Sequence, residues 1–153
     1  MRISVRVMLP CQDKSTGVRL RKIGNKINEE SIYQNRSTLD KTAYPLLSKA
    51  AEYGTNQSYK LNTWFKIKYS ESKQMVTVCF WSNTDYLTAD EKTLRGLMAE
   101  AMQLTGLKTV DGALIKSSRD WVRDSDGCWG YDDENETETI IGFRDYHSYC
   151  NMY

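Results

Sequence analysis

Residues 59–82 read YKLNTWFKIKYSESKQMVTVCFWS, and this stretch decides the fold. Its first part alternates between apolar and polar side chains, which is the two-residue period of a strand with one buried face. Polar turn-forming side chains follow at residues 71–74. Residues 75–82 are apolar at nearly every position, a pattern typical of a central strand covered on both faces. The stretch therefore predicts a β-hairpin.

The N-terminal segment predicts a further strand. Residues 2–9 alternate in the same way, and Pro10 ends the segment. Turn-forming residues follow, after which residues 18–23 can return as a short strand. Residues 24–35 are polar with little periodicity, and they are read as a loop.

Two segments predict helices. Between residues 39 and 53 the apolar side chains follow helical spacing, and Pro45 suits the first turn. The second helix begins at a capping box in which Thr88 is the N-cap and Glu91 reaches back to it. Its apolar stripe recurs at steps of three and four, and Gly106 ends it.

The last third of the chain has weaker periodicity. Residues 113–122 fit either a strand or an irregular segment, residues 124–135 are read as an acidic loop, and residues 137–146 predict a closing strand. The resulting order is strand, helix, strand, strand, helix, strand, with one short extra strand. This is the order of the ferredoxin-like split βαβ plan. We therefore expect a single α+β domain over residues 1–153, with an antiparallel sheet of four to five strands and two helices on one face.

The composition is typical of a folded protein that has no membrane-spanning segment. The 153 residues are 40% hydrophobic and include ten Tyr and four Trp, which favours a folded domain over disorder. No stretch approaches the roughly 20 apolar residues that span a bilayer, and the start of the chain lacks a signal-peptide pattern. We expect a cytoplasmic protein without a membrane partner, whose four separated cysteines are free thiols.

Charge is sorted along the chain. Residues 1–74 carry 14 Lys and Arg against 6 Asp and Glu, whereas residues 75–153 carry 7 against 14. A chain with this polarity can present one basic and one acidic surface to different partners. A binding surface of either charge requires that charges separated in sequence are also separated in space.

A basic set of residues follows the polar phase of the predicted hairpin. A tryptophan ring among cations is what single-stranded nucleic acid binding uses, because bases stack on the ring and phosphates pair with the cations. The open alternative is a plain solvated strand face whose lysines discourage edge pairing. The RNA-recognition motif shares this element order, but its glycine-rich signature is absent from residues 75–81. The candidate residues are Lys60, Trp64, Lys66 and Lys68, extended by Arg19 and Arg21.

An acidic segment lies between residues 120 and 138, where eight carboxylates accompany one arginine. The carboxylates are those of Asp120, Asp124, Asp126, Asp132, Asp133, Glu134, Glu136 and Glu138. Such a segment can mimic a phosphate backbone and occupy a basic groove of a partner. It can also hold metal ions for phosphoester chemistry, or it can be a solvated loop. The spacing does not fit a calcium-binding loop.

No catalytic or cofactor motif stands above background, and no set of metal ligands has a recognised spacing. We therefore expect a non-catalytic binding protein, in the first place an accessory or inhibitor protein of phage or mobile-element type. It would engage a protein complex that handles nucleic acid. The alternatives are direct binding of single-stranded RNA or DNA and a metal-dependent phosphoesterase. The aromatic tail can dock on that partner, on a second copy or on its own sheet; it contains Tyr146, Tyr149, Met152 and Tyr153.

Overall fold

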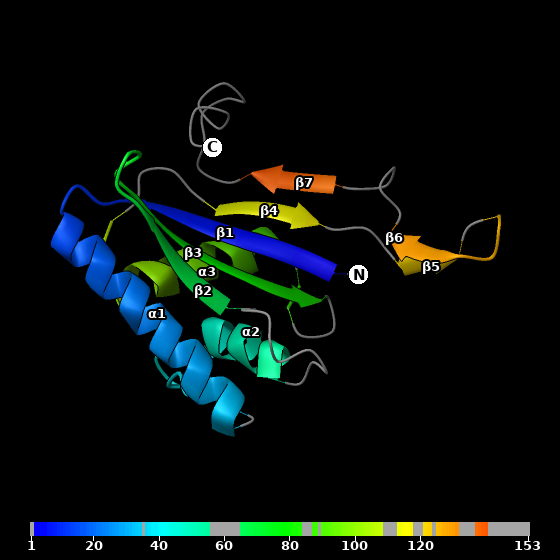
Figure 1. Ribbon diagram of the computed structural model, residues 1–153, viewed down its shortest axis with the longest axis horizontal. Coiled ribbons are helices and arrows are strands. Elements are labelled where there is room, and N and C mark those ends of the chain that lie inside the picture. Colours follow the sequence, from blue (N-terminus) through cyan, green and yellow to red (C-terminus); the bar gives the residue numbers. More distant parts are fainter. Residues whose placement is uncertain are drawn as a thin grey trace.

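Three antiparallel strands form the centre of the molecule. They are β1 (Arg2–Pro10), β2 (Phe65–Ser70) and β3 (Met75–Asn83), and they lie in the order β2-β3-β1 (Figure 1). The computed structural model that shows them describes residues 2–34, 36–55, 65–83, 87–88, 90–108, 113–117, 121–123, 125–131 and 137–140. An antiparallel sheet with packed helices confirms the predicted α+β class.

Two more strands continue the sheet beyond β1. The strand β4 (Ala113–Ser117) pairs with β1, and β7 (Thr137–Ile140) pairs with β4, so that the order becomes β2-β3-β1-β4-β7. Every neighbouring pair is antiparallel. The predicted closing strand therefore begins at its predicted residue, while residues 141–146 lie outside the described part of the chain.

The segment between β4 and β7 forms a separate hairpin. Its strands β5 (Trp121–Arg123) and β6 (Trp129–Tyr131) pair with each other, and in Figure 1 the hairpin projects from one end of the sheet. Gly127 supplies a positive φ of 81° in the turn, and its carbonyl accepts a 3.2 Å hydrogen bond from Arg123 Nε. The prediction of a loop over residues 124–135 is wrong at β6, because these residues pair across the turn.

A long helix, α1 (Lys14–Gln34), replaces the short strand predicted at residues 18–23 and the loop predicted at residues 24–35. Both predictions are wrong. Asp13 caps the helix, since its carboxylate accepts hydrogen bonds from Ser15 N at 3.2 Å and from Thr16 Oγ1 at 2.6 Å. Asp, Ser and Thr favour helix N-caps as well as turns, so the sequence of residues 13–16 is compatible with either structure.

The buried stripe of α1 is made partly of small residues, which hid its helical period. Gly17, Leu20, Gly24 and Ser31 are buried at steps of three, four and seven. The two glycines let the helix backbone approach β2 closely. A Cβ at Gly24 would lie 2.7 Å from Ile67 Cβ and 2.9 Å from its backbone nitrogen, and a Cβ at Gly17 would overlap the ring of Tyr69. In this helix glycine therefore serves packing rather than chain reversal.

Helices α2 (Pro45–Thr55) and α3 (Glu91–Thr105) correspond to the two predicted helices, with shifted N-terminal ends. The first begins at Pro45 rather than near residue 39. The second is capped by Asp90, whose Oδ1 accepts a 2.7 Å hydrogen bond from Thr93 N, rather than by Thr88. Its C-cap is confirmed: Gly106 has φ 72° and donates its N–H to the carbonyl of Met102 at 2.8 Å.

All three helices cover one face of the sheet, where two were expected. Helix α1 packs on β2, α2 on β3 and α3 on β1 (Figure 1). The strands meet them with a continuous apolar layer that is at most 1% exposed. Its members are Ile3, Val5, Val7, Leu9, Phe65, Ile67, Val76, Val78 and Phe80.

A buried carboxylate joins α3 to α2. Glu100 is only 8% exposed, and its Oε1 accepts hydrogen bonds from Leu46 N and Leu47 N, both at 3.0 Å. Glu100 therefore caps the N-terminus of α2 from another helix, where the helix dipole favours negative charge. Burial nevertheless raises the pKa of the Glu100 carboxyl, and the hydrogen bonds from Leu47 and Leu46 only partly oppose this shift.

We expect Gly24→Ala to lower the free energy of unfolding by about 1–3 kcal/mol, because the added methyl group meets the Ile67 backbone. Gly96→Ala in α3 is the matched control. Its Cβ would meet only the flexible end of Leu46, at 2.7 Å, so the helix preference of alanine should leave stability unchanged or raised by up to about 1 kcal/mol. Urea unfolding followed by circular dichroism measures both variants. Equal effects of the two substitutions would contradict the close approach of α1 to β2.

Replacement of Glu100 tests its raised pKa. A carboxyl with a higher pKa in the folded state contributes less stability as pH rises through that pKa. Glu100→Gln keeps an acceptor for the two amides but cannot ionise. The stability of the natural protein relative to this variant should therefore fall in urea titrations as pH rises over the range that begins at about pH 4, the ordinary pKa of a glutamate.

A relative stability that stays constant or rises over that range would contradict the assignment. Glu100→Ala removes the acceptor itself, so it should cost about 1–3 kcal/mol at every pH, since two amide groups are left unpaired.

Candidate nucleic-acid interface

The candidate site lies on the side of β1, β2 and β3 that faces away from the helices. Side chains alternate across a strand, so burying one phase under the helices places the other phase on the opposite side. We call that side the open face. Among the described side chains of the three strands it contains Ser4, Arg6, Met8, Lys66, Lys68, Ser70, Met75, Thr77, Cys79 and Trp81.

Three cations of the open face surround Cys79. The strand register pairs Cys79 with Arg6 on one side and with Lys66 on the other, and Lys68 lies opposite the neighbouring Thr77. Burial raises the pKa of the Cys79 thiol, whereas the positive charges of Lys68, Arg6 and Lys66 lower it in part. The thiol is therefore a poor nucleophile, and what distinguishes this point of the sheet is its positive field.

The sequences of β1, β2 and β3 contain no Asp or Glu, so these three strands contribute cations and no carboxylate to the open face. Glu71, in the turn between β2 and β3, forms a 3.4 Å ion pair with Lys14 of α1. Both members of this pair are well exposed to solvent, so it contributes little to stability. The open face thus carries net positive charge from its own strands.

A hollow of about 430 Å³ opens on this face. Arg6, Lys68 and Lys73 line it, and Met75 and Thr77 from β3 are among the other lining residues. Pockets that accept one small organic group commonly combine apolar side chains with a few polar groups, as this lining does. The hollow can therefore hold an apolar group next to an anionic one.

Trp81 completes the face and was missed by the sequence analysis. It is 40% exposed, one of two large hydrophobic side chains exposed among the described residues. Residues 75–82 were predicted to be covered on both faces, and this prediction is wrong. Only the phase of Val76, Val78 and Phe80 is buried, while the other phase lies on the open face. A strand next to an edge strand, with helices on one side only, leaves its second phase uncovered even when that phase is apolar.

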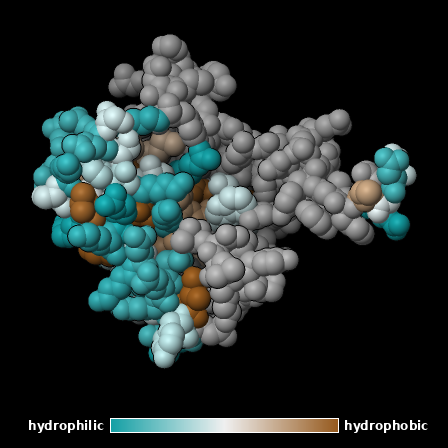
Figure 2. Space-filling model, in the orientation of Figure 1, coloured by the Kyte–Doolittle hydropathy of each residue, from teal (hydrophilic) through white to brown (hydrophobic). Residues whose placement is uncertain are grey.

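The structure brings together part of the predicted basic set. Lys66 and Lys68 lie on the open face as expected. Arg19 and Arg21 are exposed on α1, on the helix-covered side, so they do not extend this face. Lys60 and Trp64 lie outside the described residues. Figure 2 shows hydrophilic side chains gathered over α1 and the β2–β3 turn, with isolated hydrophobic ones between them.

Little of the acidic segment falls within the described residues. Asp126 is exposed in the β5–β6 turn, and Glu138 lies in β7, where its Cα pairs with that of Lys116 in β4. The other predicted members lie outside the described part of the chain: Asp120, Asp124, Asp132, Asp133, Glu134 and Glu136.

The described ranges hold no group of three or more His, Cys, Asp or Glu side chains placed to bind a metal ion. Within them, no helix has both the length and the hydrophobicity that a membrane crossing requires. No protein family, curated protein or solved structure matches the chain.

Proposed function

We propose that this chain is a non-catalytic binding protein that holds single-stranded RNA or DNA across the open face of its sheet. One observation carries the proposal: Arg6, Lys66 and Lys68 surround one point of the open face, on three strands whose sequences contain no Asp or Glu, and Trp81 is exposed on the same face. Cations that follow the phosphate backbone, together with an aromatic ring for the bases, are the two elements of sequence-tolerant single-strand binding.

The sheet order supports this use of the surface. Read from β4, the strands run β4-β1-β3-β2 with every neighbour antiparallel, and helices connect β1 to β2 and β3 to β4. This arrangement is what the ferredoxin-like split βαβ plan requires, and we propose that the domain belongs to it. RNA-binding domains with a comparable four-stranded sheet stack bases on aromatic side chains of the uncovered face. Trp81 on the inner strand β3 suits that role.

Phosphate contacts and base contacts would use neighbouring parts of the open face. Lys66, Lys68 and Arg6 are placed to pair with phosphates. Binding should therefore weaken as the salt concentration rises, because the release of counterions from the nucleic acid then contributes less free energy. The hollow between Arg6, Lys68 and Lys73 can receive a base or sugar beside a phosphate. A duplex hides the faces of its bases, and we therefore expect single strands to bind more tightly.

We expect Trp81→Ala to weaken binding of a dye-labelled single-stranded oligonucleotide by about 1–3 kcal/mol, roughly 5- to 150-fold in Kd, because a stacking ring is lost. Trp81→Phe should retain most of the affinity. Tyr33→Ala is the matched control, since Tyr33 is 91% exposed on α1, away from the open face. Fluorescence anisotropy at low salt measures all three.

The same titrations over a range of salt concentrations report the phosphate contacts. Lys66→Ala and Lys68→Ala should each lower the slope of log K against log salt by about 1, whereas Lys49→Ala on α2 should leave it unchanged. Equal losses in Trp81→Ala and Tyr33→Ala, or no binding by the natural protein at low salt, would show that the open face is not a nucleic-acid interface.

A second candidate function is that of an accessory or inhibitor protein whose acidic segment engages a nucleic-acid-handling protein complex. The observation that favours it is the β5–β6 hairpin, which projects from the sheet in Figure 1 and carries exposed Asp126. A projecting acidic element can enter a basic groove that the body of the domain could not reach.

Charge neutralisation tests this second candidate. Asp132→Asn/Asp133→Asn/Glu134→Gln should abolish co-purification of a nucleic-acid-handling protein from host extract, while circular dichroism stays unchanged. Capture of the same partner by this variant would exclude mimicry by the acidic segment.

A further inference from the structure

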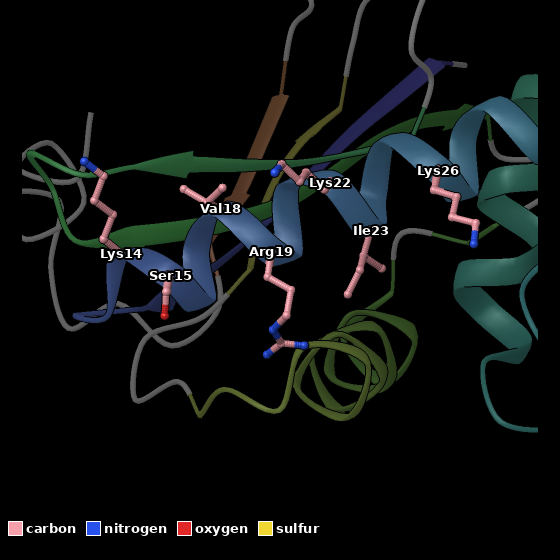
Figure 3. A pocket seen from close by; sticks show the side chains of 7 residues that line it. All are labelled: Lys14, Ser15, Val18, Arg19, Lys22, Ile23 and Lys26. Atoms are coloured by element: carbon pink, nitrogen blue, oxygen red, sulfur yellow. The ribbon is translucent and has the colours of Figure 1, made fainter.

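A groove runs along the exposed side of α1, on the side of the sheet opposite to the open face. Its volume is about 740 Å³, and four cations line it: Lys14, Arg19, Lys22 and Lys26. The apolar side chains of Val18 and Ile23 lie between these cations (Figure 3). The groove therefore combines positive charge with an apolar strip.

Helix periodicity produces this combination. The buried stripe of α1 contains Gly17, Leu20 and Gly24. The groove residues recur at steps of three and four on the flank of this stripe, where Val18 and Ile23 are half-buried and the four cations are exposed. Residues 14–26 hold five Lys and Arg and no Asp or Glu. The ion pairs of Lys14 with Glu71 at 3.4 Å and of Lys26 with Glu30 at 3.8 Å join exposed side chains, and such pairs are weak.

The chain itself contains a segment of complementary chemistry. Residues 120–138 carry eight carboxylates against one arginine, together with Trp121, Trp129 and Tyr131. Acidic and aromatic residues in one segment match cations and an apolar strip in one groove. In Figure 1 the β5–β6 hairpin and α1 lie on opposite sides of the molecule, so the hairpin is placed to meet the groove of another molecule.

We propose that the protein associates head to tail: the acidic segment of one copy docks in the α1 groove of the next. The two surfaces differ, so the contact is heterologous, and a pair of molecules keeps one unused groove and one unused acidic segment. Addition of further copies then builds a ring or an open chain. The groove and the open face lie on opposite sides of the sheet, so this association does not depend on nucleic acid binding.

Complementary charge variants test the proposal by sedimentation velocity on nucleic-acid-free protein at about 50 mM salt. The natural protein should show a mean mass that rises with concentration and returns to the monomer at high salt. Arg19→Glu/Lys22→Glu reverses two of the four positive charges that line the groove. Asp132→Asn/Asp133→Asn/Glu134→Gln neutralises three carboxylates of the acidic segment. Each variant alone should associate at least roughly tenfold more weakly.

The decisive sample is the equimolar mixture of the two variants. The groove variant retains an intact acidic segment and the acidic variant retains an intact groove, so the mixture should form a dimer of one copy each and stop there. The matched control Lys49→Glu/Lys92→Glu changes net charge by the same amount on exposed residues of α2 and α3, and it should associate like the natural protein.

Three outcomes would overturn head-to-tail association. The natural protein could be monomeric at low salt, the mixture could fail to form the dimer, or the control could disperse as fully as the groove variant. If the groove variant instead loses oligonucleotide affinity and keeps its self-association, α1 is a phosphate-binding surface and the proposal is wrong.

Discussion

The structure depends on direct contact between the backbone of α1 and strand β2. Gly17 and Gly24 stand where any larger side chain would meet Tyr69 and Ile67, so the helix lies closer to the sheet than ordinary side chains allow. This contact places α1 beside α2 and α3 on one face and completes the cover of the apolar layer. Because all the described helices share that face, the other phase of β1, β2 and β3 lies on the open face, where Lys68 and Trp81 are exposed although Met8 is buried.

Polar groups inside the helical layer fix how its elements meet. Glu100 of α3 caps α2, and Ser48 of α2 donates to Ser37, at 3.2 Å, in the connection that follows α1. In the same connection Thr38 N donates to Ser31 Oγ of α1 at 3.2 Å. Buried hydrogen bonds of this kind stabilise modestly when formed but are costly to break, so they select one arrangement of the three helices.

The sequence reveals strands and conventional caps more readily than close packing. The alternation in residues 2–9 and the stripe and C-cap of α3 could be predicted because apolar side chains and Gly106 mark them directly. Helix α1 was missed because its buried stripe uses glycine and serine, whose function depends on β2, a distant strand. Glu100 was missed for a similar reason, since its partners lie more than fifty residues away. The basic phase of β2 was predictable, whereas Trp81 required knowledge that helices cover one face only.

The cations of the basic half of the sequence lie on two surfaces, the open face and the α1 groove. The proposed nucleic acid binding depends on the open face. Nuclear magnetic resonance of the full-length, ¹⁵N-labelled protein, titrated with a single strand of about eight nucleotides at low salt, tests it most directly. The account predicts that the Trp81 indole N–H and the amides of β1, β2 and β3 shift, while the α1 amides stay in place. Shifts confined to α1 or to the β5–β6 hairpin, or no shifts at all, would contradict it.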